Sequence, residues 1–261
     1  MPYFMEHNRT MEKLRAGGFA LGLQLRSRSP LIAELAGYLG FDYLYIETEH
    51  FACSDETIES LARAAQISGV TPIVRTIHSD PENIGHLFDI GVQGVILPHV
   101  ETPDQARSFV DAAKFPPLGH RGSSASSRAA NLGCVDAEEY MEAANRNCLA
   151  IAMIETVKAV ENLEAILDSG LDMIRVGFSD LSLDMGLLGK QKDPRFLETL
   201  RYITGEAARR GIPVGGKASS AESALQYKAL GFRCLNVASD LDHLKNTLSP
   251  LLRSVREALE G

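Results

Sequence analysis

The sequence has few cysteines, no long apolar run and no apolar N-terminal leader. Its four cysteines form no CxxC pair, which argues against a zinc ribbon or a dithiol motif and predicts reduced thiols. No window approaches the roughly 18 apolar residues that a membrane span needs, and the stretch from Met1 to Arg9 does not resemble a signal peptide. We therefore expect a cytoplasmic protein without membrane contact. The cysteines are Cys53, Cys134, Cys148 and Cys234.

Positive charge is scarce and scattered along the chain. Lysine and arginine total 26 against 34 acidic residues, a formal net charge of -8, and the longest basic clusters are pairs such as Arg209-Arg210. Such a chain repels a phosphate backbone in the absence of a concentrated basic patch. We expect no nucleic-acid partner.

The composition is that of one globular domain. Of the 261 residues, 45% are apolar and 23% are charged, close to the average for soluble proteins, so disorder is not the dominant state. No linker or low-complexity tract divides the chain. We predict a single domain over residues 1–261.

One unit repeats eight times along the chain. It consists of a short apolar run, a segment with helical periodicity and a glycine that precedes the next run. The runs are apolar on both faces and therefore predict buried parallel strands. They cover Phe19 to Leu25, Tyr43 to Glu47, Pro72 to Thr76, Gly94 to Pro98, Leu149 to Glu155, Met173 to Gly177, Ile212 to Gly216 and Cys234 to Ala238.

Helix start and stop signals lie between these runs. Thr102 to Gln105 has the pattern of a capping box with proline at the first helical position, and Ser219 to Glu222 repeats it. Eight units in about 250 residues predict an α/β fold, a single (β/α)8 TIM barrel. A doubly wound open sheet is the alternative, but no GxGxxG follows any run and eight units exceed its usual six. Glycines expected to end helices in a left-handed conformation are Gly40, Gly69, Gly91, Gly170, Gly211 and Gly231.

Two segments depart from the repeat. The stretch from Pro116 to Asn131 is a long loop after the fourth run, and its length suggests a pocket wall. The final segment, residues 241–260, repeats leucine at near-helical spacing, which is sufficiently explained by a core helix that closes the barrel.

Ionisable side chains follow several of the runs. Glu47 to His50 end the second, Arg75 the third, Glu155 the fifth, and Gly177 to Asp180 follow the sixth. In this fold catalytic groups lie at the C-terminal ends of strands, so these residues are expected on one rim. Carboxylates on two adjacent strands, without a neighbouring cysteine or histidine, suit a hard divalent ion such as Mg²⁺ or Mn²⁺.

Each of these residues also has a structural interpretation. Thr156 could cap the following helix and leave Glu155 as an incidental neighbour, and Arg75 could pair with a rim carboxylate. His50 could be an ordinary surface histidine. Their predicted gathering on one rim favours a functional site.

Several motifs, in order along nearly the whole chain, give this sequence a family resemblance. It resembles the metal-dependent class II pyruvate aldolases of the HpcH/HpaI type, which include 4-hydroxy-2-oxoheptanedioate and 2-dehydro-3-deoxyglucarate aldolases and macrophomate synthase. Their barrel is of the phosphoenolpyruvate/pyruvate-binding type. The matching stretches are Tyr45 to His50, Val74-Arg75, Leu97-Pro98, Pro116 to Gly122, Ile154 to Thr156 and Gly177 to Gly186.

The resemblance implies a role for each of these positions. Glu155 and Asp180 would ligate a divalent metal (Mg, Mn or Co), and Arg75 would contact the pyruvate moiety. His50 would be the general base, steadied by Asp89. The remaining implied roles are a pyruvate carboxylate cradle around Gly177, Ser179 and Asp180, a water oriented by Glu47, and a place for Glu49 in the rim motif beside the base.

The activity implied is reversible retro-aldol cleavage of a 4-hydroxy-2-oxo acid to pyruvate and an aldehyde. The small-molecule partners are thus a 2-oxo acid and an aldehyde, in a homohexamer that exchanges the C-terminal helix 241–260. A dicarboxylate substrate predicts a second cationic contact from Arg128 or Arg121, and a sugar acid predicts contacts from the serines within 123–127. Glu47, Gln24 and Phe178-Ser179 depart from the residues frequent in relatives, which leaves the acceptor aldehyde open.

Three other functions remain as alternatives. Lys217, just past the seventh run, could form a Schiff base, since imine-forming aldolases also use this barrel. An acyl-CoA lyase of the malyl-CoA or citramalyl-CoA type has a similar acidic barrel, but no basic tract is evident for the CoA phosphates. A non-catalytic pyruvate-binding barrel would not need His50 and both metal candidates.

Overall fold

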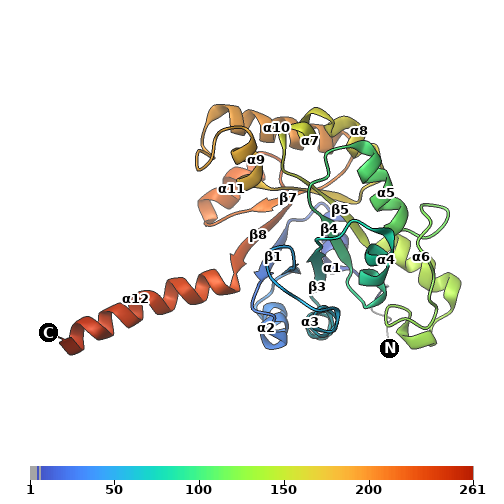
Figure 1. Cartoon of the computed structure of the whole chain (residues 1–261), viewed down its shortest axis with the longest axis horizontal. Helices are drawn as coiled ribbons and strands as arrows, with labels where there is room; N and C mark the ends of the chain where they lie inside the picture. Colours follow the sequence, from blue (N-terminus) through green and yellow to red (C-terminus); the bar gives the residue numbers. More distant parts are fainter. Residues whose placement is uncertain (1–4, 6, 261) are drawn as a thin grey trace.

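The computed structural model describes residue 5 and residues 7–260, and in it eight parallel strands close into a barrel in sequence order (Figure 1). The outermost residues of the predicted domain, and part of the stretch from Met1 to Arg9, lie outside the described residues. All eight predicted strands are confirmed, each with bounds within two residues of those expected. They are β1 (Ala20–Leu25), β2 (Tyr43–Glu47), β3 (Thr71–Arg75), β4 (Gly94–Leu97), β5 (Leu149–Ile154), β6 (Met173–Val176), β7 (Val214–Lys217) and β8 (Cys234–Ser239).

Helices follow the strands and pack around most of the barrel (Figure 1). The capping box at Thr102 is confirmed, whereas the second box lies one residue later than expected, with Ser220 as cap and Ser223 as its partner. All six glycines expected to be left-handed have positive φ. The helices are α1 (Arg9–Arg15), α2 (Pro30–Tyr38), α3 (Asp55–Ile67), α4 (Pro81–Asp89), α5 (Pro103–Ala113), α6 (Ala137–Asn147), α7 (Val157–Glu161), α8 (Leu163–Leu167), α9 (Phe178–Asp184), α10 (Pro194–Arg209), α11 (Ala221–Ala229) and α12 (Asp240–Glu260), with a 3₁₀ turn at Asn131–Gly133.

The apolar core has two parts, as a barrel requires. A larger cluster fills the space between the strands and the surrounding helices. A smaller cluster packs within the barrel and includes Tyr43, Tyr45, Met153 and Met173. Because strand side chains alternate between these two spaces, position along each strand decides which residues reach the mouth of the barrel.

Helix α12 projects away from the barrel instead of packing on it (Figure 1). Its apolar residues, which a closing helix would bury, are about half exposed. The interpretation of this segment as a core helix that closes its own barrel is therefore wrong. The exposed residues are Leu244, Leu248, Leu251, Leu252 and Val255.

No helix in the described part of the chain combines the length and apolar character needed to cross a bilayer.

Candidate active site

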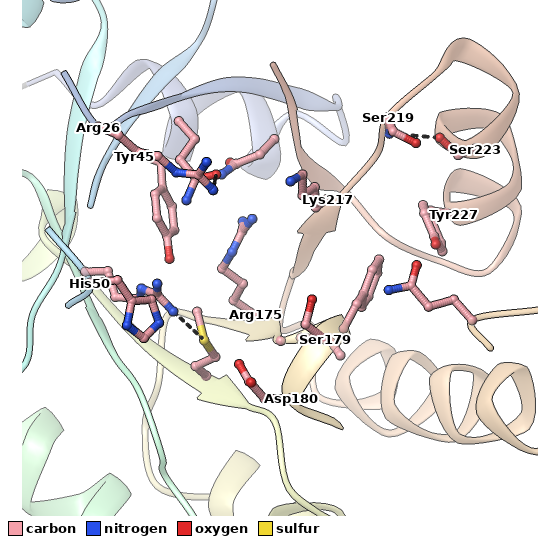
Figure 2. Close-up of a pocket in the computed structure, with 18 residues that line it drawn as sticks. Arg26, Tyr45, His50, Arg175, Ser179, Asp180, Lys217, Ser219, Ser223 and Tyr227 are labelled. Carbon is pink, nitrogen blue, oxygen red and sulfur yellow. Dashed lines mark hydrogen bonds between the residues drawn. The ribbon is translucent and has the colours of Figure 1, made fainter. Parts of the chain in front are cut away.

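A cavity of about 510 Å³ opens at the C-terminal ends of the strands. Its lining comes from seven of the eight strands or the residues just after them, and from α9 and α11 (Figure 2). The lining includes His50, Arg75, Gly177, Ser179 and Asp180, all predicted as site residues. These predicted rim residues thus share one pocket, whereas Glu47, Glu49 and Glu155 are not among the residues that line it.

Arg75, at the end of β3, is held by two glutamates. Its Nε and Nη2 atoms donate to the two carboxylate oxygens of Glu47, at 3.1 and 2.5 Å, and Nη1 lies 2.7 Å from Oε2 of Glu49. Burial by itself lowers the pKa of Arg75, but Tyr45, Glu47 and Glu49 raise it on balance. The guanidinium is therefore a fixed positive charge at the edge of the pocket.

Glu47 connects this arginine to two neighbouring segments. Its carboxylate also accepts hydrogen bonds from the backbone N–H groups of Glu49 and His50, at 2.9 and 3.4 Å, and from Gln24 Nε2 at 3.2 Å. The side chain is almost fully buried. Glu47 thus orients Arg75 and the turn that carries His50.

Glu155 is a buried carboxylate directly after β5. Burial raises its pKa, and repulsion from Asp180 and Glu49 raises it further, against the lowering effects of His99. Oε1 accepts a hydrogen bond from the backbone N–H of His99 at 2.8 Å. A Cβ added at Gly177 would lie 2.6 Å from Oε2, so the absence of a side chain there leaves room for the carboxylate.

The carboxylates fit the predicted divalent ion. Glu155 and Asp180 are close enough for their charges to repel, and a bound cation would relieve that repulsion. No cluster of three or more His, Cys, Asp or Glu side chains suited to a metal occurs within the described residues. Two oxygen ligands that leave most positions to water and substrate are usual for Mg²⁺.

The turn from β6 into α9 places Ser179 and Asp180 toward the pocket (Figure 2). Gly177 is the residue before the helix, and no side chain caps the first amides. Phe178 also lines the pocket, and its ring lies 5.6 Å from that of Phe232 and 4.8 Å from that of Tyr227. This aromatic packing anchors the turn.

His50 lies at the pocket wall with most of its imidazole exposed, at 64%, and its Nε2 is 3.8 Å from Oε2 of Glu49. Asp89, expected to steady it, lies elsewhere in the chain. It ends α4, where Oδ1 accepts a hydrogen bond from Arg121 Nη2 at 2.6 Å and where it lines a different hollow. The predicted His50–Asp89 contact is therefore not made within one chain.

The predicted acceptor contacts also lie outside the pocket. Arg128 donates to Gln66 at 2.6 Å and to the Ile90 carbonyl, and Arg121 is buried against Asp89 and Tyr140. The loop carrying them bonds back to α4 through Ala129, so it does not form a wall of this pocket. Ser123 and Ser124 line the hollow beside Asp89 instead.

Among the residues at the mouth that the sequence did not point to, His99 and Arg175 stand out because both are ionisable. His99, two residues after β4, places its ring nitrogens 3.3 Å from Glu155 and 3.4 Å from Glu49, and it has a positive φ of 54°. An ionisable residue this close to a strand end was the available signal. Arg175 lies within β6 and lines the pocket. It was overlooked because that strand was interpreted as an apolar run.

Comparison with known proteins places this geometry in context. Residues 20–247 match the family model described as HpcH/HpaI aldolase/citrate lyase. The chain is 33% identical to 2-dehydro-3,6-dideoxy-6-sulfogluconate aldolase of Pseudomonas putida, covering 90% of this chain and 92% of that protein. It is 34% identical to 5-keto-4-deoxy-D-glucarate aldolase of Salmonella arizonae, with coverages of 90% and 91%. A solved HpcH/HpaI aldolase from Desulfitobacterium hafniense aligns with a TM-score of 0.89 at 29% identity, over 94% of this chain and 96% of the other.

Proposed function

Since the chain belongs to the HpcH/HpaI aldolase/citrate lyase family and is a carbon–carbon lyase of the pyruvate aldolase class, we propose that it uses a divalent metal to cleave a 4-hydroxy-2-oxo acid reversibly to pyruvate and an aldehyde. The observation that carries this proposal is the convergence of His50, Arg75 and Asp180 on one pocket bordered by Glu155.

In the cleavage direction the C3–C4 bond breaks and its electron pair remains on C3, which gives the enolate of pyruvate. The C4 hydroxyl loses its proton to His50 as C4 becomes the aldehyde carbon, and protonation of C3 completes pyruvate. An imidazole can accept and return a proton near neutral pH, which suits His50 to this step.

Arg75 supports the other half of the reaction. With its fork already oriented by Glu47, it donates to the oxygens of the pyruvate moiety, where negative charge develops. The uncapped amides after Gly177 would bind the pyruvate carboxylate. A divalent ion (Mg, Mn or Co) held by Glu155 and Asp180 would supply Lewis acidity at the 2-oxo group.

The direct test is aldol synthesis from pyruvate and a panel of aldehydes, with the reverse reaction followed as pyruvate release. We expect turnover in both directions. Absence of carbon–carbon cleavage with every oxo acid, together with cleavage of a malyl-CoA thioester, would support the acyl-CoA lyase alternative instead.

A Schiff base at Lys217 is the second mechanism that the pocket allows, because this lysine lines it. Borohydride in the presence of pyruvate traps an imine as a stable adduct. We expect mass spectrometry to show no added mass on Lys217. A trapped adduct on this lysine would instead support the Schiff-base mechanism over the metal mechanism.

We further propose that α12 packs on a neighbouring subunit in a homo-oligomer, with a hexamer as the expected state. Its exposed leucines are the support, together with the apolar residues Leu31, Leu35 and Leu39 left exposed on and just after α2. Paired Leu248→Glu and Leu252→Glu changes should dissociate the oligomer in sedimentation experiments, whereas Lys245→Glu should not. An unchanged mass in the double variant would contradict the exchange.

A further inference from the structure

The mouth of the barrel is divided by charge. Glu155, Asp180 and the glutamates around Arg75 lie on the side of β2 to β6, where the proposed metal and pyruvate groups gather. The opposite wall, from β6 through β7 to the end of β1, presents Arg175, Lys217 and Arg26 to the same pocket (Figure 2).

Arg175 and Lys217 approach the pocket from the same face of adjoining strands. Arg175 pairs in register with Gly215, and its Nη2 donates to the Gly216 carbonyl at 2.8 Å. A Cβ at Gly215 would meet Arg175 Nη1 and Met173 inside the barrel, whereas one at Gly216 would meet Phe178 and Phe232 outside it. Because strand side chains alternate, Lys217 faces inward like Gly215, one layer nearer the mouth.

These two cations have no counter-charge in the part of the chain that the structure describes. The Arg175 residue is only 5% exposed, and its Nη1 has no hydrogen-bond partner. The exposed amine of Lys217 makes neither an ion pair nor a hydrogen bond there. Arg26 is different, since it lies 3.4 Å from Asp242 and bonds Gln24.

Arg175 stacks on the Tyr45 ring, with its Cζ 4.8 Å from the ring centroid, but this contact supplies no negative charge. A buried cation without a counter-charge is costly unless an anion reaches it, and the exposed Lys217 beside it adds a second positive charge for such an anion. The wall around these cations also offers neutral hydrogen-bonding side chains, including Ser219, Ser223 and Asn236. Its donors are suited to the oxygens of a carboxylate, sulfonate or phosphate.

We propose that Arg175 and Lys217 form an anion subsite for the charged end of the acceptor aldehyde. This rests on the proposed aldolase function and adds the substrate class: the pyruvate half lies on the carboxylate side, and the aldehyde half carries a negative terminus to the β6–β7 side. Arg175 and Lys217 thus take the role of second cationic contact that the sequence suggested for Arg128 or Arg121, which lie outside the pocket.

The test compares matched aldehydes in aldol synthesis with pyruvate. Succinic semialdehyde is paired with butanal, and glyceraldehyde 3-phosphate with glyceraldehyde. The quantity measured is the ratio of kcat/KM for the anionic over the neutral partner. Lys217→Met should lower this ratio roughly 10- to 100-fold, mainly through KM, because a charged hydrogen bond is lost. The pair with the larger wild-type ratio identifies carboxylate or phosphate as the preferred terminus.

Lys228→Met is the matched control, since Lys228 is exposed on α11 and does not line the pocket. It should leave the ratio unchanged, and Lys217→Glu should reverse the preference. An equal ratio in wild type and Lys217→Met overturns the subsite while butanal turnover still supports the aldolase. Loss of turnover with every aldehyde in Lys217→Met points to the Schiff base and also overturns it.

A binding measurement covers the case in which no aldehyde turns over. Inorganic phosphate, in buffer without divalent ions, should raise the Tm of wild type and Lys228→Met more than that of Lys217→Met. Equal shifts in the three proteins would contradict the subsite independently of catalysis.

Discussion

Gly177 and Glu155 are packed so closely that any side chain at position 177 would overlap the Glu155 carboxylate, with Oε2 at 2.6 Å from the added Cβ. Gly177→Ala should therefore displace this carboxylate and weaken Mn²⁺ affinity about 10- to 100-fold, the size usual for residues that orient ligands. Titration calorimetry measures this. Gly205→Ala is the control, because an added Cβ in α10 meets open space, and an equal affinity in both variants would contradict the role of Gly177.

Removal of the divalent ion should abolish the aldol reaction. In the proposed site Glu155 and Asp180 would hold the ion and leave positions for substrate and water, so the 2-oxo group would lose its Lewis acid on chelation. After exhaustive chelation we expect no pyruvate release, with recovery on adding Mg²⁺, Mn²⁺ or Co²⁺, and no recovery in Asp180→Ala. Full turnover by the chelated protein would rule out this assignment.

Arg75→Lys should impair turnover with every aldehyde. Lysine keeps the charge but loses the planar fork that Glu47 holds through two hydrogen bonds. The exposed Arg63→Lys provides the comparison and should have little effect. A defect limited to one aldehyde would instead move Arg75 to the acceptor side of the pocket.

His50→Ala should separate proton transfer from the other steps. A positioned general base contributes about 10²–10⁴-fold, so kcat for retro-aldol cleavage should fall by that order. Decarboxylation of oxaloacetate also passes through a pyruvate enolate but has no aldol hydroxyl to deprotonate, and it should fall much less. Equal loss of both activities would make His50 a structural residue.

The fold followed from sequence because its strands are buried on both faces and therefore read as continuous apolar runs. Arg75, Glu155 and Asp180 could be predicted at the mouth of the barrel because each ends or closely follows such a run. Arg175 was missed because a single charge inside a short apolar run does not show which way it faces.

Loop residues were less predictable. Arg128 belongs to the long loop, whose position depends on side-chain contacts with distant helices, such as that of Arg128 with Gln66. Asp89 ends α4, and its partner is Arg121 from the same loop. No local pattern specifies such contacts. For α12 the leucine spacing predicted a helix correctly, but periodicity does not say which barrel an apolar face covers.

The projecting helix has a consequence for how the protein acquires its structure. The eight strands close without α12 packing over them, so the barrel can fold within one chain before any encounter with another. In the proposed oligomer, burial of the α12 leucines would then depend on collisions between folded subunits. Refolding should show a first phase that does not depend on protein concentration and a later phase that accelerates with concentration. Chains that have completed only the first phase still expose the α12 leucines and should be prone to aggregation.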